Sequence, residues 1–226
     1  MDDELKNDLK QHIRKTGTTT VGIVCKDGII IAADTRGTYG SDRGVTYIAS
    51  KDEKKIEKVG DNIVVTTAGV ASDLQKVIKL VRAELRLKEL KSKEKPTIKQ
   101  AANLFASVAY QNIRQPSMIL GITHFLLAGY DNEGFYLYDI HPDGYLQKIE
   151  EYSSTGSGMI HINPILDSDY KKEITLKEGI DLALKLVNAS MKRDPATGEG
   201  IEVYTVTNKE VKQVAKKEVV TDFKDK

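Results

Sequence analysis

The amino-acid sequence predicts an α+β fold in which two packed β-sheets are covered by helices on both outer faces. Strand-like runs stand before, between and after two pairs of helical patterns, and this order favours such a layered arrangement. Turn sequences rich in Gly, Asp and Asn separate neighbouring strand-like runs. The 226 residues, 40% of them hydrophobic, can build a core without disulfides. We predict one domain over residues 18–215, preceded by a segment at 1–17 and followed by a charged tail at 216–226.

The first third of the chain contains two predicted β-hairpins. The runs at 19–25 and 29–33 are separated by Lys-Asp-Gly, and those at 55–59 and 63–68 by Gly-Asp-Asn, which are typical turn sequences. Between the hairpins, residues 35–52 are rich in Gly, Ser, Asp and Arg and hold only a short apolar run. We expect a long surface loop there, of the kind that often contacts ligands.

Four helices are predicted from apolar positions at helical spacing and from their N-terminal caps. Thr97 with Gln100, and Thr175 with Glu178, have the spacing of capping boxes. The predicted helices cover about 74–90, 97–108, 159–166 and 175–192. The remaining strands are expected at 119–129, 135–140, 145–150, 201–207 and 211–214.

Composition and charge exclude several classes of protein. Lys and Arg number 34 and Asp and Glu 33, so the net charge of +1 gives no reason to expect nucleic acid or an acidic membrane surface as a partner. No apolar run approaches the length of a membrane span, and the N-terminus is too charged for a secretory signal. The single cysteine, Cys25, cannot form an internal disulfide, which is typical of a reducing compartment. We predict a cytoplasmic protein.

The four histidines predict no metal site. His12, His124, His141 and His161 lack zinc-ligand spacing, and they have no acidic or cysteine partners arranged for zinc. We therefore interpret them as surface or strand residues, and we expect neither a metal ion nor another cofactor.

A run of three threonines opens the first predicted strand, directly after Gly17. We hypothesise that the chain is cut between Gly17 and Thr18, because cleavage would place an α-amine and a β-hydroxyl on one residue and so combine a base with a nucleophile. The alternative is that these threonines reflect strand propensity alone. Apolar residues recur every fourth position in 1–17, which suits a frayed helix in a removable leader, although an ordinary disordered terminus has the same composition.

Several motifs in order resemble the β subunits of the proteasome, with a leader still attached. The resemblance begins with Gly17-Thr18-Thr19-Thr20-Val21-Gly22 and continues through Lys26-Asp27-Gly28 to Ala33-Asp34-Thr35-Arg36. Further matches are Lys54-Lys55, Thr67-Ala68-Gly69 with Asp73, Gly156-Ser157-Gly158 and Arg193-Asp194, so that the likeness spans Thr18 to about Thr207. It implies the archaeal-type 20S core particle and the four-layer αββα sandwich of N-terminal-nucleophile hydrolases, in agreement with the element order.

The resemblance also implies a catalytic role for seven residues. The hydroxyl of Thr18 would attack the scissile carbonyl, with its freed amine as proton acceptor through a water molecule. An α-amine has a reference pKa of about 7.7–8.0, and the positive charge of Lys55 would lower it. Asp34 would hold Lys55 in place. The other implied roles are oxyanion donation by the Gly69 N–H, hydrogen bonding around the amine by Ser157 and Asp194, and a hydroxyl at Thr197 where the family more often has serine.

Substrate contacts are implied at Gly37, Thr38, Glu53, Thr67, Gly69 and Ala71. Glu53 would face the pocket for the residue before the cut, where an acid favours basic side chains. The segment 37–52 is several residues longer than the usual archaeal or bacterial pattern, so it would alter which peptides fit the channel. The sequence leaves cleavage specificity open.

The function implied by the resemblance is that of a threonine endopeptidase made as a zymogen, whose propeptide leaves by autocatalytic cleavage. Its partners would be other β subunits in a heptameric ring, α-subunit rings, a regulatory ATPase reached through the α rings, and a polypeptide substrate. Two alternatives stay open: a catalytically silent ring subunit, and a small-amide hydrolase on the same fold. The Gly17–Thr18 junction argues against an α-type gate. An inactive β type is disfavoured by the presence of four residues: Thr18, Asp34, Lys55 and Gly69. Whether the ring contains one or two β types is not determined by the sequence.

Overall fold

A computed structural model describes residues 15–40 and 46–219 of the chain. Within these residues the larger sheet has seven strands: β1 (Lys15–Thr16), β6 (Ile56–Lys58), β7 (Ile63–Thr66), β8 (Ala68–Val70), β9 (Thr123–Asp131), β10 (Gly134–Ile140) and β11 (Leu146–Ile149). The central strand β9 pairs with β10 on one side, and with β7 and β8 along the other. All of these pairings are antiparallel.

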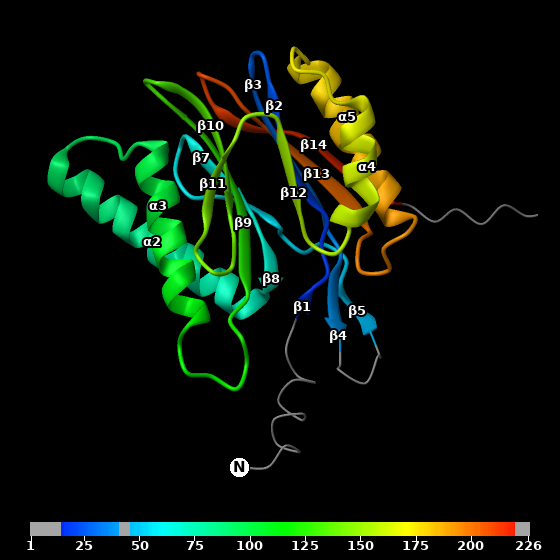
Figure 1. The fold of residues 1–226 in the computed structure, drawn as a ribbon, viewed down its shortest axis with the longest axis horizontal. Helices are drawn as coiled ribbons and strands as arrows, with labels where there is room; N and C mark the ends of the chain where they lie inside the picture. The colour runs from blue at the N-terminus through cyan, green and yellow to red at the C-terminus, as the bar shows by residue number, and fades with distance from the viewer. Residues whose placement is uncertain (1–14, 41–45, 220–226) are drawn as a thin grey trace, which may run out of the picture.

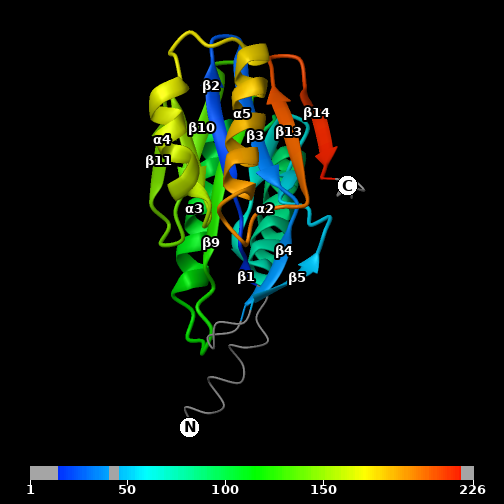
Figure 2. The same cartoon turned by 90° about the vertical axis from the view of Figure 1, so that its right-hand side faces the viewer.

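The second sheet has five strands in the described part of the chain, in the order β12-β2-β3-β13-β14. Their bounds are β2 (Thr20–Cys25), β3 (Gly28–Asp34), β12 (Tyr152–Thr155), β13 (Gly200–Val206) and β14 (Val211–Glu218). A separate hairpin consists of β4 (Gly37–Gly40) and β5 (Thr46–Ser50). Figures 1 and 2 place this hairpin and β1 at the same end of the sandwich.

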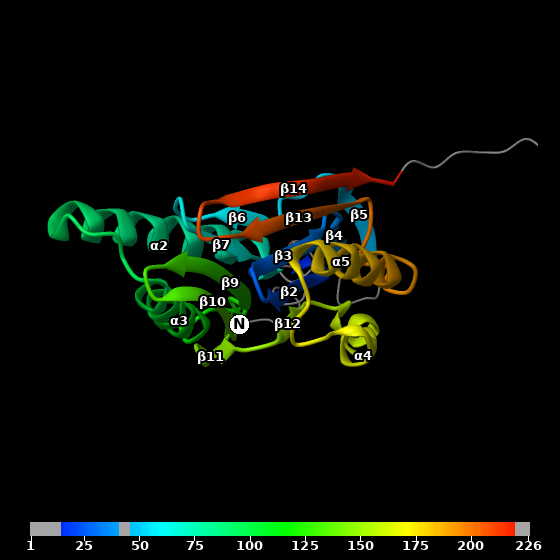
Figure 3. The same cartoon turned by 90° about the horizontal axis from the view of Figure 1, so that it is seen from above.

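Two pairs of helices cover the outer faces of the sheets, as seen along the layers in Figure 3. In the part of the chain that the structure describes, the helices are α2 (Ala71–Ser92), α3 (Ile98–Ile113), α4 (Met159–Asp169) and α5 (Leu176–Met191). Helices α2 and α3 pack on the seven-stranded sheet, and α4 and α5 on the five-stranded sheet (Figure 1). The result is the predicted four-layer αββα sandwich.

Three buried apolar layers hold these four layers together. Phe105 and Phe125 belong to the layer between α2, α3 and their sheet, and Leu186 to the layer under α4 and α5. Ile31 and Leu126 lie in the layer between the sheets. Alternate residues of β9 therefore contribute to two different layers, as expected for a strand that is covered on both faces.

Most predicted elements are present, and the differences are local. Both capping boxes form, with Gln100 N–H donating to Thr97 and Glu178 N–H to Thr175. The strand β12 was not expected, and the hairpin β4–β5 occupies the predicted loop. Strand β14 reaches Glu218, three residues into the predicted tail.

The last residues of the predicted leader differ from the helical form expected for them. Lys15 and Thr16 form a strand paired with β8, while residues 1–14 of the predicted frayed helix lie outside the described residues. Among the described helices, none has the length and apolar content required to span a bilayer.

Cys25 is buried at the end of β2, and we expect its thiol to be unreactive in the folded protein. Burial, followed by the nearby charges of Asp27 and Glu178, raises the pKa of Cys25 to about 12. The thiolate is the nucleophile, so at neutral pH iodoacetamide should label the native chain negligibly and the urea-unfolded chain completely. Mass spectrometry of both samples measures this, and fast labelling of the native protein would contradict it.

Candidate active site

The peptide bond between Gly17 and Thr18 lies between β1 of the seven-stranded sheet and β2 of the five-stranded sheet. Strand β1 runs antiparallel to β8, with Lys15 opposite Val70 and Thr16 opposite Gly69. Thr18 is fully buried, and β2 begins two residues later. The segment before Thr18 therefore lies along β8 as an added strand, and it brings the Gly17 carbonyl toward the interior.

Lys55 contacts this carbonyl directly. Its Nζ lies 2.7 Å from the Gly17 oxygen and 2.8 Å from Asp34 Oδ1. The side chain is only 1% exposed, and Asp34 is its ion-pair partner. Burial lowers the pKa of Lys55, and the attraction and hydrogen bond of Asp34 oppose this shift. A buried ammonium group is thus held against the carbonyl oxygen of the candidate cleavage site.

Asp34 is itself held by four donors. Besides Lys55, its Oδ1 accepts the Thr19 N–H at 2.9 Å, and its Oδ2 accepts the N–H groups of Arg36 at 3.1 Å and Gly198 at 3.0 Å. A carboxylate with several such donors is fixed in orientation. The Lys55 ammonium is consequently positioned by a rigid partner.

Ser157 and Asp194 approach Thr18 on its nitrogen side. The Thr18 N–H donates to Ser157 Oγ at 3.2 Å, and the Ser157 hydroxyl donates to Asp194 Oδ2 at 2.7 Å. The Thr197 hydroxyl donates to the same carboxylate oxygen, also at 2.7 Å. The threonine in place of serine therefore keeps its hydroxyl on Asp194.

A chain of hydroxyl groups extends this network. Thr19 Oγ1 lies 2.7 Å from Thr197 Oγ1 and 2.6 Å from Ser190 Oγ. Because Thr197 gives its proton to Asp194, it accepts from Thr19, which in turn accepts from Ser190. Sequence reasoning missed Thr19 and Ser190. Thr19 stands in the threonine run, whereas no sequence pattern singles out Ser190 on α5.

Two glycines permit close backbone approach at the site. Gly69 has φ +134° and Gly156 has φ +90°, conformations that disfavour any residue with a side chain. A Cβ at Gly69 would overlap the Ile122 carbonyl oxygen, and one at Gly156 would overlap that of Thr18. The turn that carries Ser157 can pack on Thr18 only because Gly156 lacks a side chain.

The predicted substrate contacts fall into two groups: residues at or near the candidate cut, and residues whose backbone N–H groups bond to the carbonyls of Lys55 and Thr35. Thr38 Oγ1 accepts the Gly17 N–H at 3.2 Å, and Gly69 pairs with Thr16, so both contact the chain around the candidate cut. Gly37 begins β4 and Ala71 begins α2. In the second group, the Thr67 N–H donates to the Lys55 carbonyl at 2.9 Å, and the Glu53 N–H to that of Thr35 at 2.7 Å. The charge of Glu53 acts on Lys55.

The interpretation that the histidines have no acidic partner arranged for a metal ion is wrong. His124 and His141 do have an acidic partner, because β9 and β10 bring Asp139 to within 2.7 Å of His124 Nε2 and 3.6 Å of His141 Nε2. His161 lies on α4, and His12 lies outside the described residues.

This αββα sandwich, with Thr18 two residues before the inner strand β2, defines the class of N-terminal-nucleophile hydrolase folds. A sequence profile described as "Proteasome subunit" matches residues 14–206. The chain therefore belongs to the proteasome subunit family.

Relatives of known name agree with this assignment. "Proteasome subunit beta" of Ferroglobus placidus is 36% identical over 203 residues, which cover 90% of this chain and 92% of the relative. The protein of the same name from Archaeoglobus fulgidus is 35% identical over 203 residues, covering 90% and 91%. "Proteasome subunit beta 1" of Thermococcus sibiricus is 36% identical over 203 residues, covering 90% and 93%. The resemblance to β subunits recognised in the sequence is confirmed, and membership of the family implies assembly with other subunits into a proteasome core.

Proposed function

We propose that this chain is a threonine-type endopeptidase subunit that removes its own residues 1–17 and then cleaves unfolded polypeptides with Thr18. The observation that carries the proposal is the contact between the Lys55 ammonium and the Gly17 carbonyl oxygen, at 2.7 Å, on the peptide bond next to the Thr18 hydroxyl. A buried positive charge stabilises the negative charge that develops on this oxygen during attack. Gly69, whose N–H is the proposed second donor, lies opposite Thr16.

In the proposed processing step, Thr18 Oγ bonds to the Gly17 carbonyl carbon and the Gly17–Thr18 C–N bond breaks. The hydroxyl proton moves to the departing nitrogen, so an ester forms and the α-amine of Thr18 is released. Water then hydrolyses the ester, giving the Gly17 carboxylate and restoring the Thr18 hydroxyl. Ser157, whose oxygen faces the Thr18 nitrogen, is the proposed proton carrier, and Asp194 orients it.

After processing, the same residues would act on substrate. The freed amine would take the proton of the Thr18 hydroxyl through a water molecule. Lys55, already held by Asp34, would keep this amine unprotonated by charge repulsion and would donate to the substrate carbonyl. The vacated path along β8 would receive the peptide as an added strand, a mode of binding in which main-chain pairing gives affinity.

We further propose that the core is built from heptameric rings of β subunits flanked by α-subunit rings, with a regulatory ATPase beyond them. Membership of the family supports assembly with other subunits. The arrangement in rings is what the resemblance to proteasome β subunits implies. Glu53 is the proposed determinant of a preference for basic residues before the cut. The cytoplasm stays the predicted location.

Intact-mass measurement of the purified particle, together with its activity on fluorogenic peptides, tests this function. We expect a mass that corresponds to the chain beginning at Thr18, and covalent labelling of Thr18 by a peptide electrophile. Cleavage at another bond would contradict the mechanism. A processed particle that cleaves a small amide but no peptide would favour the alternative hydrolase, and one that cleaves neither would favour a silent subunit.

The absence of a side chain at Gly17 should be necessary for fast leader removal. An added Cβ at this position would overlap the Cβ of Ala196 and crowd Thr38 Oγ1. We expect Gly17→Ala to slow leader removal by about 100-fold, because it displaces the carbonyl from Lys55. The double variant G17A/A196G restores the space and should recover much of the rate, as followed by intact mass over time. An unchanged rate in G17A would show that this packing does not position the carbonyl.

A further inference from the structure

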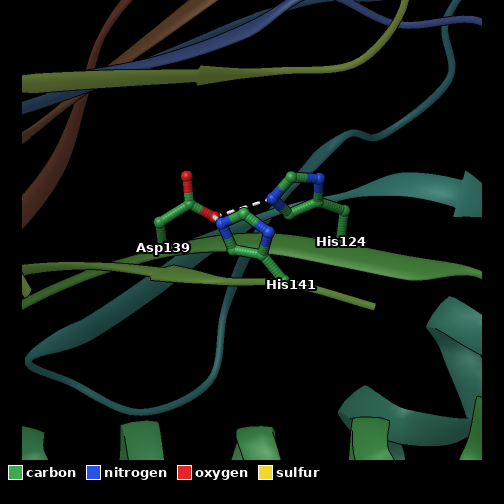
Figure 4. A group of neighbouring side chains, drawn as sticks. All are labelled: His124, Asp139 and His141. Atoms are coloured by element: carbon green, nitrogen blue, oxygen red, sulfur yellow. Dashed lines mark hydrogen bonds and ion pairs between the residues drawn. The ribbon is translucent and has the colours of Figure 1, made fainter. Parts of the chain in front are cut away.

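Two histidines and an aspartate converge on the face of the seven-stranded sheet that is turned toward the other sheet. His124 lies on β9, Asp139 on β10, and His141 directly follows β10. One ligand atom from each residue lies within 4.8 Å of the others. Figure 4 shows one carboxylate oxygen of Asp139 directed toward the two imidazole rings and the other directed away from them.

We propose that His124, Asp139 and His141 bind a divalent transition-metal ion such as Zn²⁺, with water in the fourth position. Imidazole nitrogen suits zinc, cobalt and nickel, whereas magnesium and calcium prefer sites made of oxygen alone. Two histidines and one carboxylate, with one position left to solvent, form a known type of three-ligand zinc site. No residue of this cluster has a role in the proposed peptidase reaction.

The distances between the ligand atoms are close to those required. A tetrahedral zinc ion with bonds of about 2.0–2.2 Å holds its ligand atoms roughly 3.3 Å apart. Asp139 Oδ1 lies 2.7 Å from His124 Nε2 and 3.6 Å from His141 Nε2. When an ion binds, the first distance has to lengthen and the second to shorten, each by a few tenths of an ångström. The two rings, 5.0 Å apart between centroids, must turn toward each other. His141, 41% exposed, can do so at low cost.

The surroundings of Asp139 support an ion site. Its side chain is 8% exposed, and its second oxygen accepts the Ser153 hydroxyl at 2.6 Å from the opposite sheet. Such a second contact fixes the orientation of a ligating carboxylate. The carboxylate is thus aimed at the rings, and His141 leaves a path to solvent.

An ion at this position would join β9 to the end of β10, close to β8, the strand that pairs with β1. His124 follows Thr123, which pairs with Gly69 on β8, and Ser153 lies on β12 opposite Gly22 of β2. Through the hydrogen bond from Ser153 to Asp139, the site also contacts the five-stranded sheet. Added zinc should raise the unfolding temperature, since a ligand that binds only the folded state stabilises it.

Calorimetric titration of the tag-free full chain, stripped with a chelator, tests this proposal. We expect one Zn²⁺ per chain, Co²⁺ binding at the same site, and no binding of Mg²⁺. Ser153→Ala removes a hydrogen bond to a ligand and should weaken Zn²⁺ binding by about 10- to 100-fold. His141→Asn removes a ligand and should weaken the binding more than Ser153→Ala does. His161→Asn is the matched control: it removes a histidine of α4, away from the cluster, and should leave zinc affinity unchanged.

Three results would overturn the site. The first is absence of Zn²⁺ binding by the wild-type chain. The second is equal weakening by His161→Asn and His141→Asn. The third is a wild-type affinity in Asp139→Asn, which would place the ion elsewhere. Circular dichroism confirms that each variant is folded, and because His141 is partly exposed, His141→Asn keeps the test valid if a variant of a buried residue fails to fold.

Discussion

Replacing Thr18 with alanine should leave residues 1–17 attached and abolish peptidase activity. The variant keeps the backbone of the cleavage site, including the contact of the Gly17 carbonyl with Lys55, but it lacks the oxygen that attacks this carbonyl. The leader would then stay paired with β8 along the proposed peptide path. Intact mass and fluorogenic peptide hydrolysis measure the two effects, and we expect a complete loss of both processing and activity.

Thr18→Ser is the matched control for this variant, because it keeps the hydroxyl and removes only the methyl group. It should process to a chain that begins with serine and should retain measurable activity. A Thr18→Ala chain that is nevertheless trimmed at Gly17 would refute self-processing and point to an external protease. Trimming of neither variant would show that a hydroxyl at residue 18 does not suffice.

Replacing Lys55 with methionine should slow leader removal and peptide hydrolysis by about 10²–10³-fold, the usual cost of losing one donor to a developing oxyanion. Methionine has a similar length, so it fills the buried space but cannot donate to the Gly17 oxygen at 2.7 Å. The substitution leaves Asp34 buried without its cation, which costs roughly 3–5 kcal/mol of folding stability. Denaturant unfolding must therefore accompany the rate measurement.

Lys54→Met is the matched control, since Lys54 carries the same charge, stands next in sequence and is exposed. It should process at the wild-type rate with little loss of stability. A folded Lys55→Met chain that loses its leader as fast as the Lys54→Met chain would contradict the role proposed for the ammonium group.

Local sequence signals predicted the parts of this fold that depend on near neighbours. The capping boxes at Thr97 and Thr175 involve residues three positions apart, and both form. Strand β12 escaped prediction because Tyr-Ser-Ser-Thr lacks apolar alternation, and it is a strand only through its pairing with β2. The strand at Lys15–Thr16 likewise exists through its pairing with β8.

Sequence motifs predicted one part of the candidate site, whereas the other part depends on packing that no motif encodes. The contacts of Lys55 and Asp34 agree with the resemblance, whereas Ser190 reaches Thr19 only because α5 packs on the five-stranded sheet. The histidine cluster depends on strand register. The β9–β10 ladder ends with Phe125 opposite Ile140, so that His124 and His141 are the next residues on each strand. No spacing within the sequence encodes that neighbourhood.

The outermost position of β14 in the five-stranded sheet has a consequence for solubility. A long strand with an unpaired side is a template on which foreign strands can add, and lysine is a common defence against such growth. Strand β14 spans eight residues and carries Lys212, Lys216 and Lys217. Another chain that aligned along it would have to bury or displace these ammonium groups. The strand therefore protects the protein from aggregating through its own sheet edge.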